Sequence, residues 1–167
     1  MTKIKNEILS DTIVINSRDL MSKKNINSYI KYILKKKYED TCNNNGYVIP
    51  DSLEIIERSV GKLKTINSES LISYNINYKI DTIIPTIEEE FKCTINSVTK
   101  MGIIGYYDFK KNNKIDENPI LFIIPNEYIK DQEKEYKKGE IIDVKVLDIR
   151  IKFRSKQIQI IGEQIIS

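Results

Sequence analysis

Aromatic and basic side chains gather in one short part of the sequence, around MGIIGYYDFKK at residues 101–111. The cluster comprises three aromatic residues and three lysines: Tyr106, Tyr107, Phe109, Lys100, Lys110 and Lys111. Rings that stack on bases and lysines that contact phosphates are typical of proteins that bind single-stranded nucleic acid. In an extended strand Tyr107 and Phe109 share one face and Tyr106 lies on the other. One face must be core, so only part of the cluster can meet a ligand, and the sequence leaves open which part.

A second basic group occupies alternate positions near the C-terminus. Its members are Arg150, Lys152, Arg154 and Lys156. In an extended strand and its turn these side chains project from one face, and Ile149, Ile151 and Phe153 should enter the core from the other. Such a stripe can follow a phosphate backbone. It can equally be a solubilising outer face whose lysines prevent edge-to-edge aggregation, and both interpretations stay open.

Catalytic and metal-binding constellations are missing from the sequence. There is no histidine, and the two cysteines, Cys42 and Cys93, lie far apart, so neither a zinc site nor an activated nucleophile is expected. Residues 88–90, Asp143 and Asp148 do not form a credible carboxylate pair, and no phosphate-binding glycine loop is present. We therefore expect no catalytic residue, no metal and no cofactor, with a small carboxylate-dependent hydrolase as the remaining enzymatic alternative.

Length and composition predict a folded protein of one ordinary domain or two small ones. The chain has 167 residues, of which 40% are hydrophobic and 31% charged. No apolar run is long enough to cross a membrane, and the N-terminus lacks the pattern of a signal peptide, so we expect an intracellular protein. Residues 1–84 carry 13 Lys and Arg against 10 Asp and Glu, and residues 85–167 carry 14 of each. Any nucleic-acid role must therefore depend on local patches.

The first half predicts one helix among strands. Residues 8–15 are rich in β-branched side chains and predict a strand. Residues 25–40 predict a helix, begun by Asn25 or Asn27 and ended by the Asn-Asn-Asn-Gly run at 43–46. Its apolar stripe comprises Ile26, Tyr29, Ile30, Ile33 and Leu34. Lysines 35–37 in its last turns complement the helix dipole; contact with a phosphate or an acidic partner is the alternative.

Three further strands complete the predicted first half, at residues 46–50, 53–63 and 71–84. In the last of them, isoleucines and tyrosines from residue 72 to residue 80 alternate with polar residues, which indicates one buried and one wet face. A strand, a helix and three strands predict a small α+β domain over residues 1–84.

The second half predicts a β-barrel over residues 85–167. Phe91, Cys93 and Ile95 alternate with polar residues, and a strand at 101–109 follows, in which Ile103 should fill the barrel. Residues 119–125 predict a fully buried strand, and residues 126–138 an irregular segment or short helix. Apolar alternation changes parity between Val146 and Leu147, which predicts a β-bulge in a bent strand. These strands predict a five-stranded OB-type barrel, giving an overall α+β fold.

The order of these segments resembles the larger stalk subunit of DNA-directed RNA polymerases, the family of subunit 7 of eukaryotic RNA polymerase II and its archaeal counterpart. The resemblance covers nearly the whole chain. It depends on GYVI (46–49), SVGKLK (59–64), PTIEEEF (85–91), the MGI at 101–103 and the terminal hairpin. The short barrel, with a composition rich in isoleucine, asparagine and lysine, looks most like the versions in large cytoplasmic DNA viruses.

The resemblance implies a non-catalytic subunit whose N-terminal half docks on the polymerase core near the clamp. Four positions match family segments that contact the core: Gly46, Tyr47, Val48 and Gly61. Gly102 and Ile103 match the barrel strand, and the barrel would lie near the RNA exit path. The expected partners are the largest polymerase subunits and nascent RNA. Binding to RNA is expected to be weak, because the second half of the chain has no net charge.

Two points stay open at this stage. A smaller stalk subunit could sit on the helix face of Ile26, Tyr29, Ile30 and Ile33, but the sequence does not decide whether one exists. The alternative to a stalk subunit is a free-standing OB-fold protein that binds single-stranded RNA in translation or RNA processing. A viral protein would work in the cytoplasm or the virion, and a cellular one in the nucleus.

Overall fold

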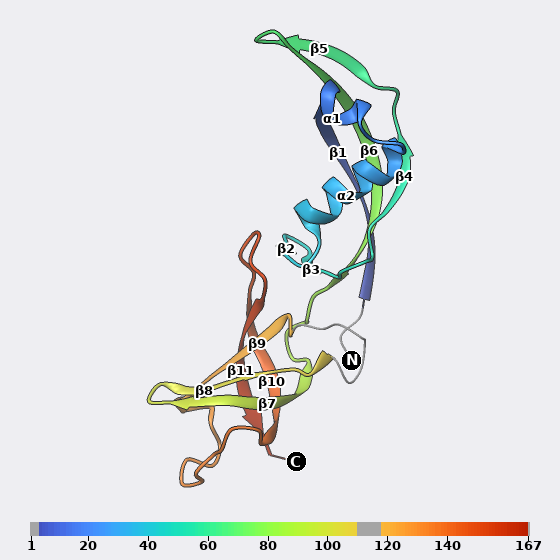
Figure 1. Ribbon diagram of the computed structural model, residues 1–167. Coiled ribbons are helices and arrows are strands. Elements are labelled where there is room, and N and C mark those ends of the chain that lie inside the picture. Colours follow the sequence, from blue (N-terminus) through green and yellow to red (C-terminus); the bar gives the residue numbers. More distant parts are fainter. Residues whose placement is uncertain (1–3, 110–117, 167) are drawn as a thin grey trace. The chain divides into compact units, whose positions relative to one another are not determined.

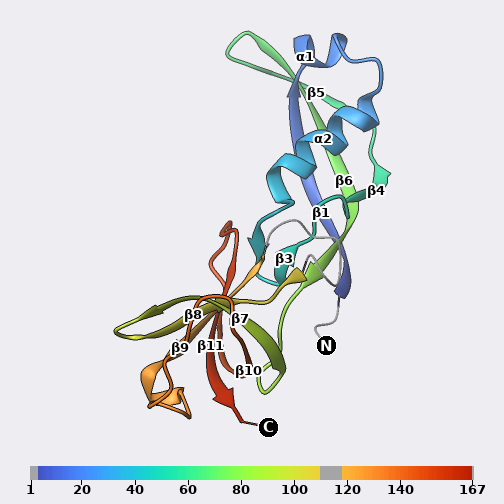
Figure 2. The same cartoon turned by 60° about the horizontal axis from the view of Figure 1, so that its bottom comes forward.

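The computed structural model describes residues 4–109 and 118–166, and strands predominate in it (Figure 1, Figure 2). The chain forms two compact units. One contains residues 5–39 and 48–82; the other contains residues 40–47 together with the chain from residue 83 onward. Residues 40–47 thus belong with the C-terminal unit, whereas the division after residue 84 into two folding domains stays a prediction.

Two long strands, β1 (Ile4–Asn16) and β6 (Glu69–Ile83), are the basis of the first unit, and they are neighbours in its sheet. The predicted alternation in β6 is confirmed, because Tyr74, Ile76 and Tyr78 are buried on one face. Polar side chains of the other face pair across to β1: Ser10 Oγ donates to Asn77 Oδ1 at 2.6 Å. The sheet is therefore apolar on one side and wet on the other.

Helix α2 (Ile26–Tyr38) covers the apolar face, and its predicted start at Asn25 is confirmed by a hydrogen bond from the Ser28 N–H to the Asn25 side chain. Ile30 and Leu34 are fully buried, and the rest of the predicted stripe packs against the same core. The stripe therefore packs on the sheet, with Ile26, Tyr29 and Ile33 only half-buried, and the seating of a smaller subunit on this face stays a prediction. A short helix, α1 (Ser17–Met21), precedes α2 and was not predicted.

The strand predicted over residues 53–63 is two strands, β4 (Glu54–Arg58) and β5 (Lys62–Ile66), both antiparallel to β6. The break follows from Ser59, whose hydroxyl oxygen accepts the Asn75 N–H at 2.9 Å in place of a backbone carbonyl. Gly61 lies in this break, so the prediction that it lies inside a strand is wrong.

Five strands of the second unit close into a barrel: β7 (Glu90–Thr99), β8 (Gly102–Tyr106), β9 (Ile120–Pro125), β10 (Ile141–Arg150) and β11 (Ile158–Ile165). Around the barrel the order is β7-β8-β9-β11-β10, and β10 pairs with β7 to close it. The pairs are antiparallel except β9 with β11, which is parallel. The predicted closed five-stranded barrel is thus confirmed.

Alternate residues of these strands fill the barrel. Buried apolar side chains come from every strand: Phe91, Cys93, Ile95, Ile103, Ile120, Phe122, Ile124, Ile142, Val144, Val146, Ile158 and Ile160. Gly105 faces the same interior, where an added Cβ would lie 2.3 Å from Cys93 Sγ. Strand β9 is not fully buried as predicted, because Leu121 and Ile123 lie on the outer surface and are half-buried. The predicted bulge is confirmed by a register shift between Val146 and Asp148.

Two shorter features complete the second unit. A 3₁₀ helix, η1 (Asn126–Tyr128), opens the otherwise irregular segment before β10, as predicted. Strands β2 (Cys42–Asn43) and β3 (Gly46–Val48) form an antiparallel hairpin, in which β3 is the neighbour of β6 in the six-stranded sheet; residues 42–47 of this hairpin are grouped with the second unit. Within residues 4–109 and 118–166, no helix is long and apolar enough to span a membrane.

Candidate nucleic-acid interface

A row of outward-facing side chains crosses four strands of the barrel. Tyr106 on β8 pairs with Leu121 on β9, Leu121 pairs with Gln159 on β11, and Gln159 pairs with Arg150 on β10. Tyr106 and Leu121 are half-buried, and Gln159 and Arg150 are exposed. Since neighbouring strands lie about 4.8 Å apart, the row spans roughly 15 Å. It brings one predicted aromatic and one predicted cation onto a single continuous surface.

The other predicted aromatics lie beyond the end of β8 and do not alternate as strand residues. Tyr107 contacts both neighbouring phenylalanines, with ring centres 5.3 Å from Phe91 and 4.8 Å from Phe109. Phe109 is only 1% exposed, so its ring closes the barrel core and presents no face to a base. Tyr107 remains half-buried. Lys110 and Lys111 lie outside the described residues.

Lys100 is separated from the aromatic side chains by the whole length of β8. It sits in the exposed turn between β7 and β8, and its carbonyl oxygen accepts a hydrogen bond from Asn126 Nδ2 at 2.6 Å. With a rise of about 3.4 Å per residue, the two ends of β8 are roughly 14 Å apart. The cluster MGIIGYYDFKK is therefore divided between two ends of one strand.

Residues 151–157, between β10 and β11, form a basic tip, which we call the β10–β11 tip. The prediction of a continued strand with Ile149, Ile151 and Phe153 in the core is wrong: Phe153 is 58% exposed, and the two isoleucines are only half-buried. β10 ends at Arg150, because Arg154 adopts φ +64° and the chain turns back through the Ser155 N–H, which donates to the Lys152 carbonyl at 2.9 Å.

The turn creates an exposed aromatic and cationic pair that the sequence did not predict. The Arg154 guanidinium lies 5.6 Å from the centre of the Phe153 ring. Such a pair offers a flat face for a base and a charge for a phosphate in the same place. Alternation assigned Phe153 to the core, so no local signal could have identified it.

Backbone hydrogen bonds hold the β10–β11 tip against residues 40–42 of the same unit. The Cys42 N–H donates to the Ser155 carbonyl at 2.7 Å, and the Arg154 N–H donates to the Cys42 carbonyl at 2.9 Å. Lys156 Nζ lies 3.5 Å from the Asp40 carboxylate, which also accepts the hydroxyl of the buried Tyr47 at 2.7 Å. The tip is thus preorganised, and the charge of Lys156 is partly neutralised.

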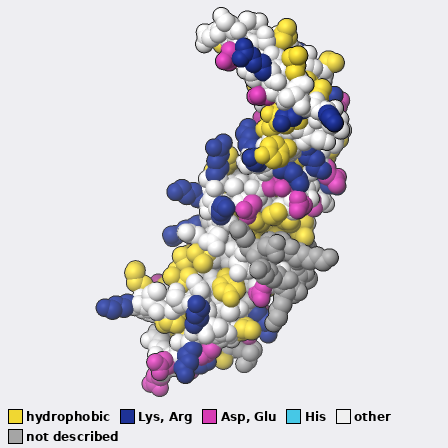
Figure 3. Space-filling view, in the orientation of Figure 1, with side chains coloured by type: hydrophobic (Ala, Val, Ile, Leu, Met, Phe, Trp, Pro, Cys, Tyr) yellow, Lys and Arg dark blue, Asp and Glu magenta, His cyan; other side chains and the backbone are white. Residues whose placement is uncertain are grey.

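Different degrees of charge pairing distinguish the four basic residues of the predicted stripe. Arg150 lies 3.5 Å from Asp148, but both are well exposed, so the pair is weak. Among the described residues, Lys152 and Arg154 have no carboxylate within ion-pair distance, and both are exposed. Figure 3 shows Lys and Arg side chains projecting from the described surface, with acidic and basic groups mixed in the lower part of the view. The tip therefore presents two exposed cations, Lys152 and Arg154, that make no ion pair with another described residue.

Three of the four positions expected to contact a polymerase core are buried. Tyr47 and Val48 are at most 1% exposed, and Gly46 is also buried, with φ +130° and room for no side chain because a Cβ would lie 2.3 Å from the Ile83 carbonyl oxygen. Gly61 is exposed. The three buried residues shape the β2–β3 hairpin, so a partner would reach their surroundings rather than their side chains.

The two thiols are unsuited to metal binding or nucleophilic chemistry. Burial raises the pKa of Cys42 to about 11. Burial also raises the pKa of Cys93 to about 12, against a smaller opposing effect of a backbone hydrogen bond. Both groups are therefore neutral thiols near neutral pH. Within the described residues no three Cys, Asp or Glu side chains come together as a metal site would require.

Comparison with family models gives no match, and comparison with curated proteins gives none.

Proposed function

We propose that this chain is the larger, non-catalytic stalk subunit of a DNA-directed RNA polymerase and that its barrel contacts single-stranded RNA. The observation that carries the RNA-binding part is the barrel order β7-β8-β9-β11-β10 with its parallel β9–β11 pair, which is the connectivity of an OB fold. In OB folds the second and third strands, with the loops after the first and fourth, bind oligonucleotides.

The candidate residues occupy those positions. Tyr106 lies on the second strand, Lys100 follows the first, and the β10–β11 tip follows the fourth. In the proposed complex, bases stack on Tyr106 and Phe153, and the cations Arg150, Lys152 and Arg154 contact phosphates. Because few cations are uncommitted, binding should be weak and sensitive to salt. Such contacts suit a surface that guides an emerging transcript rather than one that holds it.

The polymerase part of the proposal is supported by the resemblance over nearly the whole chain. Nucleotide addition would take place in the large subunits, which fits the lack of any catalytic constellation in the sequence. The N-terminal half would dock on the core near the clamp. Of the four positions that match core-contacting segments of the family, Gly61 is the exposed one.

Affinity purification tests this assignment. The tagged chain, recovered from its native source in low salt, should bring down the two largest polymerase subunits, identified by mass spectrometry. A chain with Lys152→Ala and Arg154→Ala should recover them equally well, because the tip is assigned to RNA rather than to docking. Recovery of the tagged chain without those subunits would overturn the stalk assignment.

A free-standing single-stranded RNA-binding protein is the second candidate, favoured by the exposed Phe153 and Arg154 pair. It predicts that the isolated chain binds short RNA while purification recovers no polymerase subunit. The stalk assignment predicts polymerase recovery whether or not the isolated chain binds RNA tightly. The two measurements together separate the candidates.

A further inference from the structure

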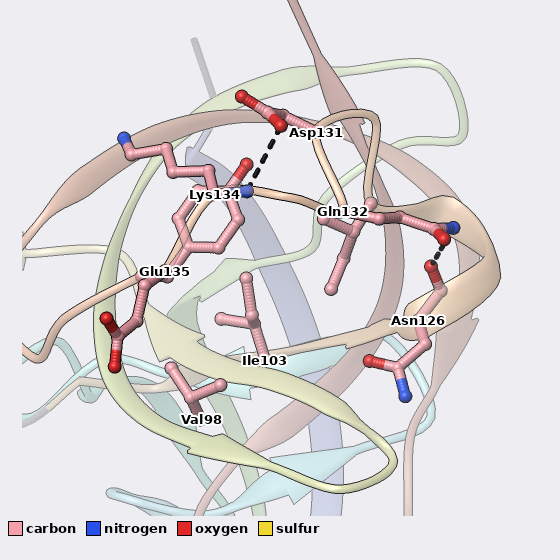
Figure 4. Close-up of a pocket in the computed structure, with 9 residues that line it drawn as sticks. Val98, Ile103, Asn126, Asp131, Gln132, Lys134 and Glu135 are labelled. Carbon is pink, nitrogen blue, oxygen red and sulfur yellow. Dashed lines mark hydrogen bonds between the residues drawn. The ribbon is translucent and has the colours of Figure 1, made fainter.

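A pocket of about 540 Å³ lies on the barrel beside the irregular segment that joins β9 to β10 (Figure 4). This volume is in the range of protein sites that hold small ligands or a few side chains. None of its described lining residues belongs to the proposed RNA surface, and the pocket carries a different balance of charge.

Apolar side chains form the strand side of the pocket. Val98, at the end of β7, is 51% exposed, and Ile129 and Tyr136 are half-buried around it. Ile103 lies fully buried beneath them. Figure 4 shows Val98 and Ile103 on the strand side, and Asp131, Gln132, Lys134 and Glu135 on the loop that faces them. The exposed Val98 is therefore an apolar surface that a ligand could cover.

The loop is anchored, so the pocket is preformed. Gln164, only 7% exposed, accepts the Lys130 N–H at 3.0 Å, and its amide nitrogen donates to the Tyr136 hydroxyl at 3.0 Å. Lys130 Nζ also pairs with Glu163 at 2.6 Å. At the other end, Gln132 Nε2 donates to the Asn126 carbonyl at 3.3 Å. A ligand would not have to order this segment on binding.

The uncommitted charges of the pocket are negative. Among the described residues that line it, Lys134 is the one cation, and it is paired with Glu140 at 3.0 Å. Asp131 uses one carboxylate oxygen to accept the Lys134 N–H at 3.2 Å, which leaves its other oxygen available. Glu135 is exposed and makes no ion pair with another described residue. Two carboxylates therefore flank an apolar floor.

We propose that this pocket docks a short basic segment of a partner protein. An aliphatic side chain of the segment covers Val98, and a neighbouring lysine or arginine reaches Asp131 and Glu135. The same carboxylates repel phosphates, so the pocket itself would bind protein while the β10–β11 tip binds RNA. The inference is independent of the proposed RNA function, because it uses other residues and the opposite charge.

Peptide titration followed by amide NMR tests the proposal on the full chain. The probes are blocked pentapeptides Gly-Lys-Leu-Lys-Gly, Gly-Lys-Ser-Lys-Gly and Gly-Glu-Leu-Glu-Gly. The first should shift the amide resonances of Val98, Gln132 and Glu135 at millimolar concentration, and the other two should bind more weakly. The variant with Asp131→Asn and Glu135→Gln should bind the first peptide about five-fold more weakly, as expected for two exposed ion pairs.

Glu133→Gln is the matched control, because Glu133 lies on the same loop but does not line the pocket. Its affinity for the lysine–leucine peptide should equal that of the wild type, and the spectra themselves report whether each variant is folded. No shift at these amides, equal binding of the acidic peptide, or equal weakening by Glu133→Gln would each overturn the proposal.

Discussion

Removing the cations of the β10–β11 tip and the adjoining strand should lower the salt dependence of RNA binding. The change is Arg150→Ala, Lys152→Ala and Arg154→Ala in one chain. All three side chains are exposed, and the ion pair of Arg150 with Asp148 at 3.5 Å is solvent-screened, so folding should change little. The backbone hydrogen bonds that hold the tip to Cys42 do not depend on these side chains.

The magnitude follows from counterion release. Each phosphate contact on a single strand contributes about 0.7 to the slope of log affinity against log salt concentration. Loss of three contacts should therefore reduce the slope by about 2. Between about 50 mM and 200 mM salt, the wild-type affinity should fall roughly twenty-fold more than that of the variant. Lys156 is left unchanged because Asp40 already lies 3.5 Å from it.

Fluorescence anisotropy with a short labelled oligouridine, measured across a salt series, gives both slopes. The matched control removes three other exposed lysines of the same unit with Lys92→Ala, Lys137→Ala and Lys138→Ala. It changes net charge equally and should leave the slope close to that of the wild type. If both triple variants lose the same slope, binding is a property of net charge and the assigned surface is refuted. If the wild type shows no binding in low salt, the barrel has no RNA site.

Three further predictions concern folding: two test the barrel that carries this surface, and the third tests the unit that contains β1 and α2. Gly102 has φ +152°, and an added Cβ would lie 2.1 Å from a carbonyl oxygen of β9, so Gly102→Ala should destabilise the chain by about 2–4 kcal/mol in urea unfolding. Gly139→Ala, with φ +92° but nothing within 4 Å, should cost only about 1 kcal/mol, and equal costs would contradict the steric argument. Phe109→Ala should lower the free energy of unfolding by about 3–5 kcal/mol, because the ring is part of the core. Tyr106→Ala should mainly weaken RNA binding. If Tyr106→Ala destabilised the chain and Phe109→Ala weakened RNA binding instead, both assignments would be wrong. Burial would raise the pKa of Asp11, but hydrogen bonds from a tyrosine and a lysine of α2 lower it overall below its ordinary 3.8. Because the pKa is lower in the folded state, ionised Asp11 makes its full contribution to stability above the ordinary pKa of 3.8. This contribution is lost as the pH falls through the folded pKa. The stability difference between wild type and Asp11→Asn should therefore stay constant near neutral pH and shrink below about pH 4, and a difference that grows in acid would show that the carboxylate is not stabilised by folding.

Strand positions were predictable wherever one face of a strand is buried. The alternation of Phe91, Cys93 and Ile95 corresponds to a barrel strand with the same three residues inside. The parity change at Val146 and Leu147 corresponds to the register shift in β10. Both signals are local, because pleating alone forces every second side chain to one side of the sheet.

Local patterns failed where a distant part of the chain determines the backbone. The apolar and basic alternation from Ile149 onward would suit a strand, yet the chain turns at Arg154, whose N–H pairs with the Cys42 carbonyl. Likewise Ser59 interrupts a strand because its hydroxyl, rather than a carbonyl, takes the partner's N–H. Neither partner is identifiable from the neighbouring residues in sequence.

The same limit explains why the functional surface was only half predictable. Residue types at Lys152 and Arg154 indicate a phosphate contact, and strand register then brings Arg150 into one row with Tyr106. Phe153 joins that surface only because hydrogen bonds to Cys42 stabilise a turn, rather than a continued strand, in the tip. A ring that alternation assigns to the core thus becomes the most exposed aromatic near the cations. The preorganised tip is therefore a consequence of tertiary contacts, and its RNA affinity should depend on Cys42 and Asp40 although neither is proposed to touch RNA.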